Sequence, residues 1–427
     1  MISFIIYVAL TIEFFLRIVF NRIIMSFVIN RYPVEARKIV IFGAGKIGRS
    51  FIGQLFGCSG YKVVFIDTNP VIVSGLNIRG RYRVIIKGEK EEEIIVPNVQ
   101  AVSAFEKQKV IETVSTASII AVSVGKSSLE KIIPVLAEGL KLRFNRYGNC
   151  PLDIIIAENM RDAGDFFRER LNGILPDDYP LEELVGLIET SIGKMVPIMT
   201  QADMDKDPLM IYAEPYNTLI LDRKGFRSSI PDIKGLAPKD NIKAWVDRKA
   251  FIHNLGHATA AYYSFHRHPE TIYLYEALDD TEVYNFTKNV MLQSAAVLKV
   301  AYPEDFTMND LEDHIDDLLS RFHNKSLGDT IYRIGHDLTR KLGYEDRFMG
   351  VIHLASHVGM RYDKILEAMN YGFSFRAKDE KENIFMPDFI FMDSLAKEFE
   401  MTIIKYLGFD SEADKFVIEE LKKFYNK

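Results

Sequence analysis

The sequence predicts an α/β protein in which a doubly wound, mostly parallel sheet is followed by a mostly α-helical C-terminal domain. Short runs rich in β-branched residues alternate with helical stretches through the first half of the chain, which is the pattern of a sheet with helices on both faces. The first run ends at a glycine-rich segment, and beyond about Asn241 the strand signal fades. A chain of 427 residues also exceeds the usual size of one hydrophobic core, so two domains are expected.

The individual strands are predicted from their apolar runs. Residues 38–42 (KIVIF) form the first strand, residues 50–56 an amphipathic helix and residues 62–66 (KVVFI) the next strand, which together make one βαβ unit. An alternating pattern predicts a hairpin at the edge of the sheet over residues 82–96. Further buried strands are expected over residues 117–124, 153–157 and 184–188.

The chain divides into three parts on this pattern. A hydrophobic extension covers residues 1–37, the sheet domain residues 38–240 and the helical domain residues 241–427. Neither domain contains an internal repeat, which excludes a solenoid.

The N-terminal extension fits no standard targeting segment. Glu13, Arg17 and Arg22 interrupt it, whereas a membrane-spanning helix needs about 20 predominantly apolar residues, and no secretory cleavage pattern follows it. Three interpretations stay open: translation starts later, for example at Met25, or the segment is an amphipathic helix packed on the protein, or it is a membrane-surface anchor.

Composition and charge exclude several classes of function. The net charge of -6, without a long basic run, gives no electrostatic footprint for nucleic acid, so small molecules are the expected partners. The two cysteines, Cys58 and Cys150, are too few for a disulfide framework or a cysteine zinc site. A cytoplasmic location is expected, and no feature outside the extension calls for a membrane.

A dinucleotide-binding motif follows the first predicted strand. Residues 43–48 read G-A-G-K-I-G, in which Gly43 permits a tight turn, Gly45 lets the backbone approach a pyrophosphate and Gly48 lets helix and strand pack closely. Asp67 ends the second strand, where its carboxylate can bind the ribose hydroxyls and repel a 2′-phosphate, so NAD is favoured over NADP. The alternative is that these residues only form a turn and a cap. The residues expected at the cofactor are Phe42, Gly43, Ala44, Gly45, Lys46, Ile47, Gly48, Arg49 and Asp67.

The motif predicts that residues 38–240 are an NAD-binding Rossmann-type domain. The helical half of the chain contains candidate groups for the oxidation of an alcohol. Lys249, Asn254 and His257 lie in a predicted helix, and at about 100° per residue they spread over roughly 140°. A lysine with a lowered pKa can take the hydroxyl proton while amides stabilise the developing oxyanion. Asn159, at the carboxyl end of the strand over 153–157, is a candidate second donor.

Two other interpretations of this helix are open. The lysine can be a solvated side chain, the histidine a structural residue and the asparagine a cap. Alternatively His253 and His257, four residues apart, can bind a metal, although the glutamate of H-E-x-x-H is absent at position 254.

Taken together, the motifs resemble the polyol-specific long-chain dehydrogenases, the mannitol dehydrogenase family, and within it the mannitol-1-phosphate branch. The resemblance covers nearly everything after about Lys38. The segments that carry it are FGAGKIGRSFIG, Glu158-Asn159, the K-x-x-x-x-N-x-x-H of Lys249, Asn254 and His257, Arg321-Phe322-His323-Asn324, Asp329, Arg333, Arg340-Lys341-Leu342 and Asp346-Arg347.

What the resemblance implies is a metal-independent, NAD-dependent oxidoreductase that interconverts D-mannitol 1-phosphate and D-fructose 6-phosphate. It implies a lysine acid/base at Lys249, an oxyanion hole from Asn159 and Asn254, and a histidine at His257 that orients substrate and lysine. It is compatible with a monomer. In place of the V-D-R-I-V-P of that branch, residues 192–197 read I-G-K-M-V-P, so the substrate is the open point.

A sugar phosphate needs cations to hold its phosphate group. Arg340, Lys341 and Arg347 are candidates because guanidinium and ammonium groups match phosphate oxygens, although they can equally form a solvated helix face. The alternative activity within the family is reduction of a hexuronate, tagaturonate or fructuronate. The alternative of another class is a non-catalytic NAD-binding module that senses redox state.

Overall fold

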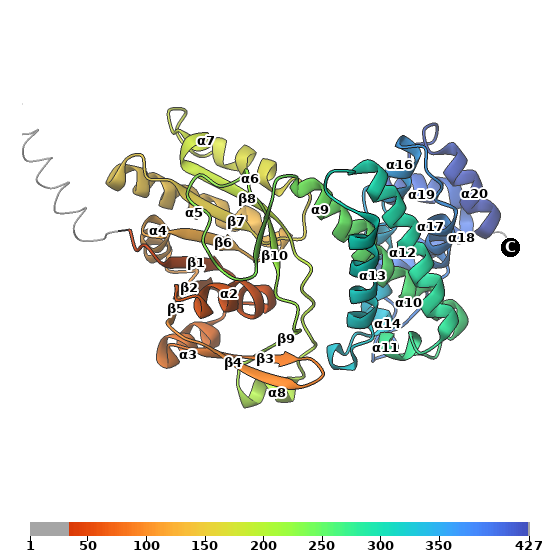
Figure 1. Cartoon of the computed structure of the whole chain (residues 1–427), viewed down its shortest axis with the longest axis horizontal. Coiled ribbons are helices and arrows are strands. Elements are labelled where there is room, and N and C mark those ends of the chain that lie inside the picture. The colour runs from red at the N-terminus through yellow and green to blue at the C-terminus, as the bar shows by residue number, and fades with distance from the viewer. Residues whose placement is uncertain (1–33, 426–427) are drawn as a thin grey trace, which may run out of the picture.

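The computed structural model describes residues 34–425, which form a sheet domain and a helical domain connected by α9 (Ile242–Arg248). Figure 1 shows the sheet domain on the left and the helical domain on the right. The predicted fold class is confirmed: a Rossmann-type sheet is followed by a helical domain. The interpretations offered for residues 1–30 lie outside the described residues.

The main sheet has the strand order of a dinucleotide-binding fold. Its order is β11-β10-β8-β7-β6-β1-β2-β5, in which the strands from β8 to β5 are parallel and β10 is antiparallel to β8. The chain order reverses between β1 and β6, and ligands of such sheets bind at the carboxyl ends of the strands around this point. The bounds are β1 (Lys38–Phe42), β2 (Lys62–Asp67), β5 (Val99–Ser103), β6 (Ile119–Val122), β7 (Leu152–Ile156), β8 (Val185–Ser191), β10 (Leu219–Asp222) and β11 (Leu236–Lys239).

Helices cover both faces because the central strands are apolar on both sides. In β1, Ile39 and Ile41 face one layer, while Val40 and Phe42 face the other. The first layer contains η1 (Gly48–Gly53), α2 (Gln54–Cys58) and α3 (Pro70–Arg79); the second contains α4 (Lys107–Ser115), α5 (Lys126–Tyr147) and α6 (Ala163–Asn172). The short helices α7 (Leu181–Leu184) and α8 (Gln201–Lys206) complete the domain.

The predicted hairpin forms, but its predicted place at the edge of the main sheet is wrong. Strands β3 (Tyr82–Lys87) and β4 (Glu91–Val96) join β9 (Ile211–Ala213) in a separate three-stranded sheet. The inward residues of β3 pack on the layer that contains η1, and the Tyr82 hydroxyl donates to the Arg49 carbonyl oxygen at 2.7 Å. Because the inward face of β3 is buried against this layer, the hairpin lies on the layer and not at the edge of the main sheet. The edge strand of the main sheet is β5.

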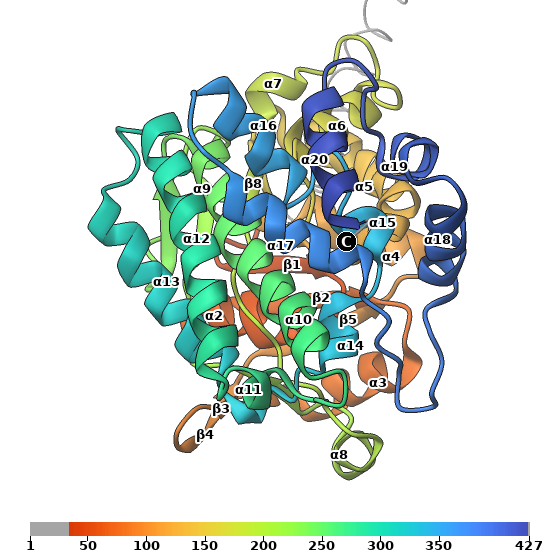
Figure 2. The same cartoon turned by 90° about the vertical axis from the view of Figure 1, so that its right-hand side faces the viewer.

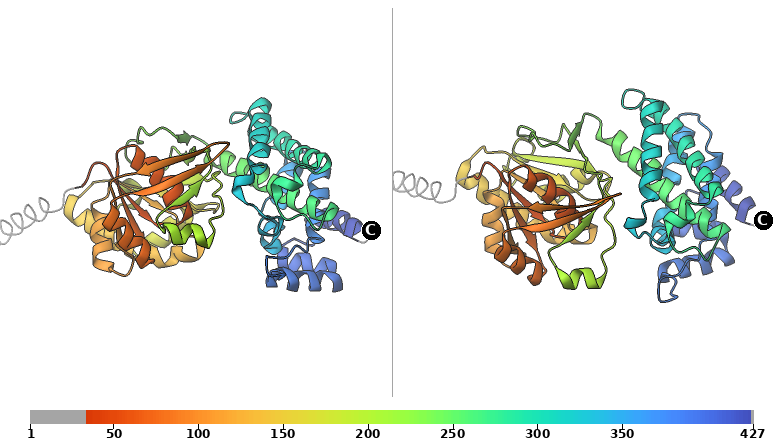
Figure 3. Two further views of the ribbon diagram at one scale, coloured as in Figure 1. Left: turned by 90° about the horizontal axis from the view of Figure 1, so that it is seen from below. Right: turned by 60° about the horizontal axis from the view of Figure 1, so that its bottom comes forward.

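The hairpin also contacts the helical domain. Its tip points toward that domain in Figure 3, and the Asn324 amide donates to the Lys87 carbonyl oxygen at 3.0 Å. The two domains are thus connected by this hydrogen bond as well as by α9.

The second domain is built around α10 (Leu255–Arg267), which packs against α12 (Thr281–Ala301), α14 (Ile331–Gly335) and α17 (Asp363–Phe373). Figure 2 views this domain from outside. Its other elements are η2 (Lys249–Asn254), α11 (Leu274–Ala277), α13 (Met308–Phe322), η3 (Lys325–Leu327), α15 (Leu338–Lys341), α16 (Met349–His357), α18 (Met386–Lys397), α19 (Phe399–Leu407) and α20 (Lys415–Tyr425).

Candidate active site

The glycine loop has the geometry that close approach of a dinucleotide requires. Gly43 has a φ of 95°, and a Cβ there would lie 2.4 Å from the Ser123 carbonyl oxygen. A Cβ at Gly48 would lie 1.9 Å from the Gly43 carbonyl oxygen, whereas a Cβ at Gly45 would meet no atom within 4 Å. Gly45 is exposed, so its backbone is open to a ligand at the start of the helix, where unpaired N–H groups attract phosphate.

Asp67 is fixed beside this loop. Its carboxylate accepts hydrogen bonds from the Ala44 N–H at 2.7 Å and from the Asn69 N–H at 2.8 Å, one on each oxygen. Each oxygen keeps a further lone pair, which suits an additional donor such as a ribose hydroxyl. Asp67 therefore both caps the following turn and remains available to a ligand.

The side chain of Arg49 serves the fold of the loop. It is buried, and its guanidinium donates to the carbonyl oxygens of Ala44 at 2.7 Å, Leu209 at 2.7 Å and Pro208 at 3.1 Å. Phe42 is likewise buried in the core of the sheet. Of the predicted cofactor residues, these two contribute through the shape of the loop.

A cavity of about 450 Å³ runs along the carboxyl edge of the sheet from this loop. We call it the cofactor cavity. Its walls are the glycine loop, the ends of β6 and β7, and the segment after β8, and it reaches η2 of the helical domain. The lining residues are Lys46, Ile47, Ser123, Val124, Gly125, Ala157, Glu158, Asn159, Ile192, Lys194 and Lys249.

The helix that carries Lys249 has a local geometry that the sequence analysis did not anticipate. Residues 249–254 are π-helical, with hydrogen bonds between residues five apart. Lys249 and Asn254 are five residues apart, so they lie above one another instead of 140° apart. Both side chains consequently face one cavity, without the lysine having to lean across a helix.

Lys249 contacts Asn159 from the other domain. Its ammonium donates to Asn159 Oδ1, which leaves the amide nitrogen of Asn159 to donate elsewhere. The pKa of Lys249 is lowered to about 8, chiefly by burial, with a contribution from the cations Arg347 and Arg340 that Asp346 opposes. The result is a lysine that exchanges its proton near neutral pH.

A second cavity of about 480 Å³, which we call the substrate cavity, lies between the domains. It shares Glu158, Asn159, Ile192 and Lys249 with the cofactor cavity, so the two meet at the lysine. The remaining lining residues are Lys126, Met160, Arg161, Thr190, Ser191, Val246, Ala250, Asn254, Thr339, Arg340, Gly343, Tyr344, Glu345, Asp346 and Arg347.

The structure brings two of the three predicted phosphate ligands to this cavity. Arg347 is buried and donates to Asp346 Oδ1 at 2.7 Å and to the Asn254 carbonyl oxygen at 3.3 Å. Arg340 is half exposed and pairs with Asp337. Lys341 does not line the cavity, because its buried ammonium donates to the carbonyl oxygens of Ile334 and His336.

His257 is also placed apart from both cavities. Its ring stacks on Phe322 with 4.6 Å between centroids, and its Nε2 lies 3.5 Å from Asp329 Oδ2. Burial keeps the pKa of His257 well below its ordinary value, as do the nearby cations, Arg333 first among them. It lies eight residues beyond Lys249, about two helical turns, where it packs within the helical domain and does not line the cavity.

Lys126 and Arg161 are cavity residues that the sequence analysis did not single out. Lys126 begins α5 directly after the β6 strand, and Arg161 follows Asn159 by two positions and pairs with the buried Asp247 at 2.7 Å. Their signal in the sequence is position, since both follow predicted strands at the edge where ligands bind.

Two kinds of feature are absent from the part of the chain that the structure describes. Among residues 34–425, no group of three or more His, Cys, Asp or Glu side chains is arranged to hold a metal ion. In the same range, no helix combines the length and the apolar character that crossing a membrane requires.

Comparison with known proteins gives matches over most of the chain. Residues 37–235 match the mannitol dehydrogenase Rossmann domain and residues 241–401 the mannitol dehydrogenase C-terminal domain. Mannitol-1-phosphate 5-dehydrogenase of Geobacillus stearothermophilus is 36% identical over 314 residues, which are 73% of this chain and 80% of that protein. The structure of Pseudomonas fluorescens mannitol 2-dehydrogenase, a ternary complex with NAD and D-mannitol, has the same fold, with a TM-score of 0.68, 13% identity and 91% of each chain covered.

Proposed function

The chain belongs to the mannitol dehydrogenase family, and on this premise we propose that it interconverts D-mannitol 1-phosphate and D-fructose 6-phosphate with NAD as cofactor. The observation that carries the proposal is the substrate cavity, in which Lys249, Asn159 and Asn254 share one space with Arg340 and Arg347. A proton-exchanging lysine with two amides suits a carbonyl that becomes an alcohol, and the arginines suit a phosphate.

The glycine loop and the cofactor cavity fit a dinucleotide. The open backbone at Gly45 and the fixed carboxylate of Asp67 are the features that pyrophosphate and adenosine ribose need. When bound, NADH supplies the hydride for reduction and NAD accepts it for oxidation. Because the cofactor cavity meets the substrate cavity at Lys249, the reacting carbon is expected to lie beside that residue.

Lys249 is the proposed acid and base. In the reduction of the ketose, its ammonium gives a proton to the oxygen of the former carbonyl, and in oxidation the neutral amine takes that proton back. The amide nitrogens of Asn159 and Asn254 donate to the same oxygen while it carries negative charge. Asn159 has a second task, because its Oδ1 holds the Lys249 ammonium in place.

The proposed phosphate end of the substrate lies toward Arg340 and Arg347, and Lys126 and Arg161 line the same cavity. The guanidinium of Arg340 is half exposed, so its free donors can turn to a phosphate. In this proposal cations from both domains surround one anionic group, and binding of the substrate would draw the domains together. The relative from G. stearothermophilus, whose name gives the same substrate, supports this interpretation.

The proposal is tested by the oxidation of NADH with four ketoses: fructose 6-phosphate, fructose, tagaturonate and fructuronate. We expect fructose 6-phosphate to give the highest kcat/KM. Preference for a hexuronate would keep the fold, the cofactor and Lys249 but replace the substrate. Activity with none of the four would contradict the proposed substrate class altogether.

We further propose that the enzyme acts in the cytoplasm. Both cysteines, Cys58 and Cys150, are free thiols, as expected of a reducing compartment. Localisation of the tagged full-length chain by fractionation tests this proposal.

A further inference from the structure

Lys194 is a buried cation of the cofactor cavity that the proposed mechanism does not use. Its side chain is 6% exposed, and its ammonium donates to Asn217 Oδ1 at 2.8 Å. It also lies over the ring of Phe51, 5.2 Å from the centroid. An ammonium has three donors, so this one keeps hydrogen-bonding capacity for a ligand in the cavity that it lines.

The position of Lys194 in the cavity indicates which part of the cofactor it can contact. The glycine loop, with Lys46, lies at the end of the cavity where the pyrophosphate binds, and Lys249 lies where hydride is exchanged. Lys194 follows β8 and lines the cofactor cavity but not the substrate cavity. It shares the cofactor cavity with Lys249, so it can contact the cofactor near the point of hydride exchange but not the sugar.

The charge of Lys194 is not cancelled by its one buried carboxylate neighbour. Glu214 is already engaged by Arg321, whose guanidinium donates to it at 2.8 and 2.6 Å, and by the Met195 N–H. Arg321 pairs with Glu214 and also, at 3.3 Å, with Asp317, so the protonated Lys194 adds a positive charge that no ion pair among the described residues offsets. This charge lies in the wall of the cofactor cavity.

We propose that Lys194 contacts the nicotinamide half of the cofactor and makes the protein bind NADH in preference to NAD⁺. The oxidised nicotinamide ring carries a positive charge and the reduced ring is neutral, so a neighbouring cation repels only the oxidised form. In a site of low dielectric constant such repulsion easily reaches a factor of about ten in affinity. The inference rests on the NAD dependence proposed above but not on the identity of the sugar.

The protonation of Lys194 makes this preference pH-dependent. The pKa of Lys194 is lowered to about 7, chiefly by burial; Glu214 opposes this effect and Arg321 adds to it. The lysine is therefore charged at about pH 6, where the preference for NADH is expected, and neutral at about pH 9, where the preference fades. The other charged groups that line the same cavity are Lys46, Glu158 and Lys249.

The test is the ratio of two dissociation constants, measured without substrate at about pH 6. The Kd of NADH comes from its fluorescence and the Kd of NAD⁺ from competition with NADH. Lys194→Met should lower the ratio of the NAD⁺ Kd to the NADH Kd by about tenfold. Lys46→Met is the matched control, because a lysine at the pyrophosphate end should change both affinities by the same factor and leave the ratio unchanged.

A charge-conserving variant guards against a loss of packing. Lys194→Arg should keep the preference for NADH, and it should weaken the dependence on pH because an arginine stays protonated. The change that remains should follow Lys249 of the same cavity, whose pKa is about 8. A wild-type ratio in Lys194→Met with NADH still bound would overturn this inference. If the wild-type chain discriminates the two forms through Lys194 but reduces none of the ketoses, the proposed substrate fails while this inference stands.

Discussion

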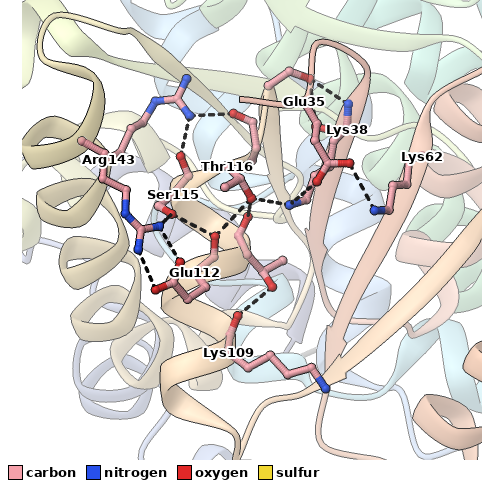
Figure 4. A network of polar contacts seen from close by, with 12 residues as sticks. Glu35, Lys38, Lys62, Lys109, Glu112, Ser115, Thr116 and Arg143 are labelled. Atoms are coloured by element: carbon pink, nitrogen blue, oxygen red, sulfur yellow. Dashed lines mark hydrogen bonds and ion pairs between the residues drawn. The ribbon is translucent and has the colours of Figure 1, made fainter. Parts of the chain in front are cut away.

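The two ends of the main sheet treat their buried cations in opposite ways. At the amino end, Lys38 contacts Glu35 at 3.2 Å and Thr116 Oγ1 at 2.5 Å (Figure 4). Arg143, which is 3% exposed, donates to four backbone carbonyl oxygens, those of Ser115, Ala117, Cys150 and Pro151. The donors of Arg143 are used up and Lys38 has two partners, so these cations hold strand ends and helix ends together.

At the carboxyl end, the cations are left with spare capacity. Lys249 and Lys194 each donate to one amide oxygen of the described residues, Asn159 and Asn217, and both line cavities. Burial lowers the pKa of both lysines, to about 8 and about 7. The comparison teaches that the same residue type is structural where its donors are used up and functional where they are not. Four predictions test it, in order of decreasing effect on turnover.

The largest effect is expected from Lys249→Ala. Removal of the proposed acid should lower kcat for the preferred ketose at least several hundredfold, within the range of general acid catalysis, about 10²–10⁴. The Kd of NADH should stay the same, since the cofactor is held mainly at the glycine loop. Steady-state rates and NADH fluorescence measure the two quantities.

Lys243→Ala is the control for this variant, because Lys243 is exposed on α9 six residues before Lys249. It should leave kcat unchanged. Wild-type turnover in Lys249→Ala would disprove the assignment of Lys249 as acid and base.

The second effect is that of pH. Reduction needs the protonated Lys249, whose pKa is about 8, so kcat/KM for the ketose should be flat below about pH 8 and fall tenfold per unit above it. Oxidation needs the neutral amine, so kcat/KM for the polyol should rise toward pH 8 and then level off. If kcat/KM changed with pH in the same sense for reduction and for oxidation, the result would contradict a single lysine that gives and takes the proton.

The third effect concerns substrate choice. Arg340→Met should raise KM for fructose 6-phosphate about tenfold, which corresponds to the loss of one charge-assisted hydrogen bond of about 1.4 kcal/mol. Activity with unphosphorylated fructose should not change, because that sugar has no anionic group for Arg340 to bind. Arg361→Met, which removes an arginine from an exposed surface pair with Asp363, is the control, and an equal KM change with both sugars would argue against a phosphate contact.

Much of the sheet domain, including the edge at which the site lies, was predictable from the sequence. The β-branched runs over 38–42, 62–66 and 153–157 mark strands buried on both faces, and their ends locate the glycine loop and Asn159. Strands β5, β9, β10 and β11 were not predicted, because no β-branched run like those of β1, β2 and β7 marks them. The fold class follows from local patterns, whereas strand order at the edges depends on packing between distant segments.

The site was less predictable than the fold. In a regular helix with 3.6 residues per turn, Lys249 and Asn254 would point in different directions. The π-helical segment brings them together, and no pattern in the sequence predicts such a segment. Lys341 and Arg340 are neighbours of the same charge, yet one is buried against carbonyl oxygens and the other lines the cavity. Such differences depend on the three-dimensional path of the chain, and the pattern of charges in the sequence does not predict that path.

The smallest effect on turnover is expected at the amino end of the sheet. Arg143→Met leaves four buried carbonyl oxygens without their donor, so the free energy of unfolding should fall by about 3 kcal/mol. Turnover of the folded enzyme should not change, because no atom of Arg143 lines either cavity. Urea denaturation and steady-state rates of the same preparation measure both, and Arg168→Met, at an exposed ion pair with Glu182, should cost less than about 1 kcal/mol. A loss of kcat in Arg143→Met at unchanged stability would mean that the two ends of the sheet are coupled, and that saturation of donors does not separate structural from functional cations.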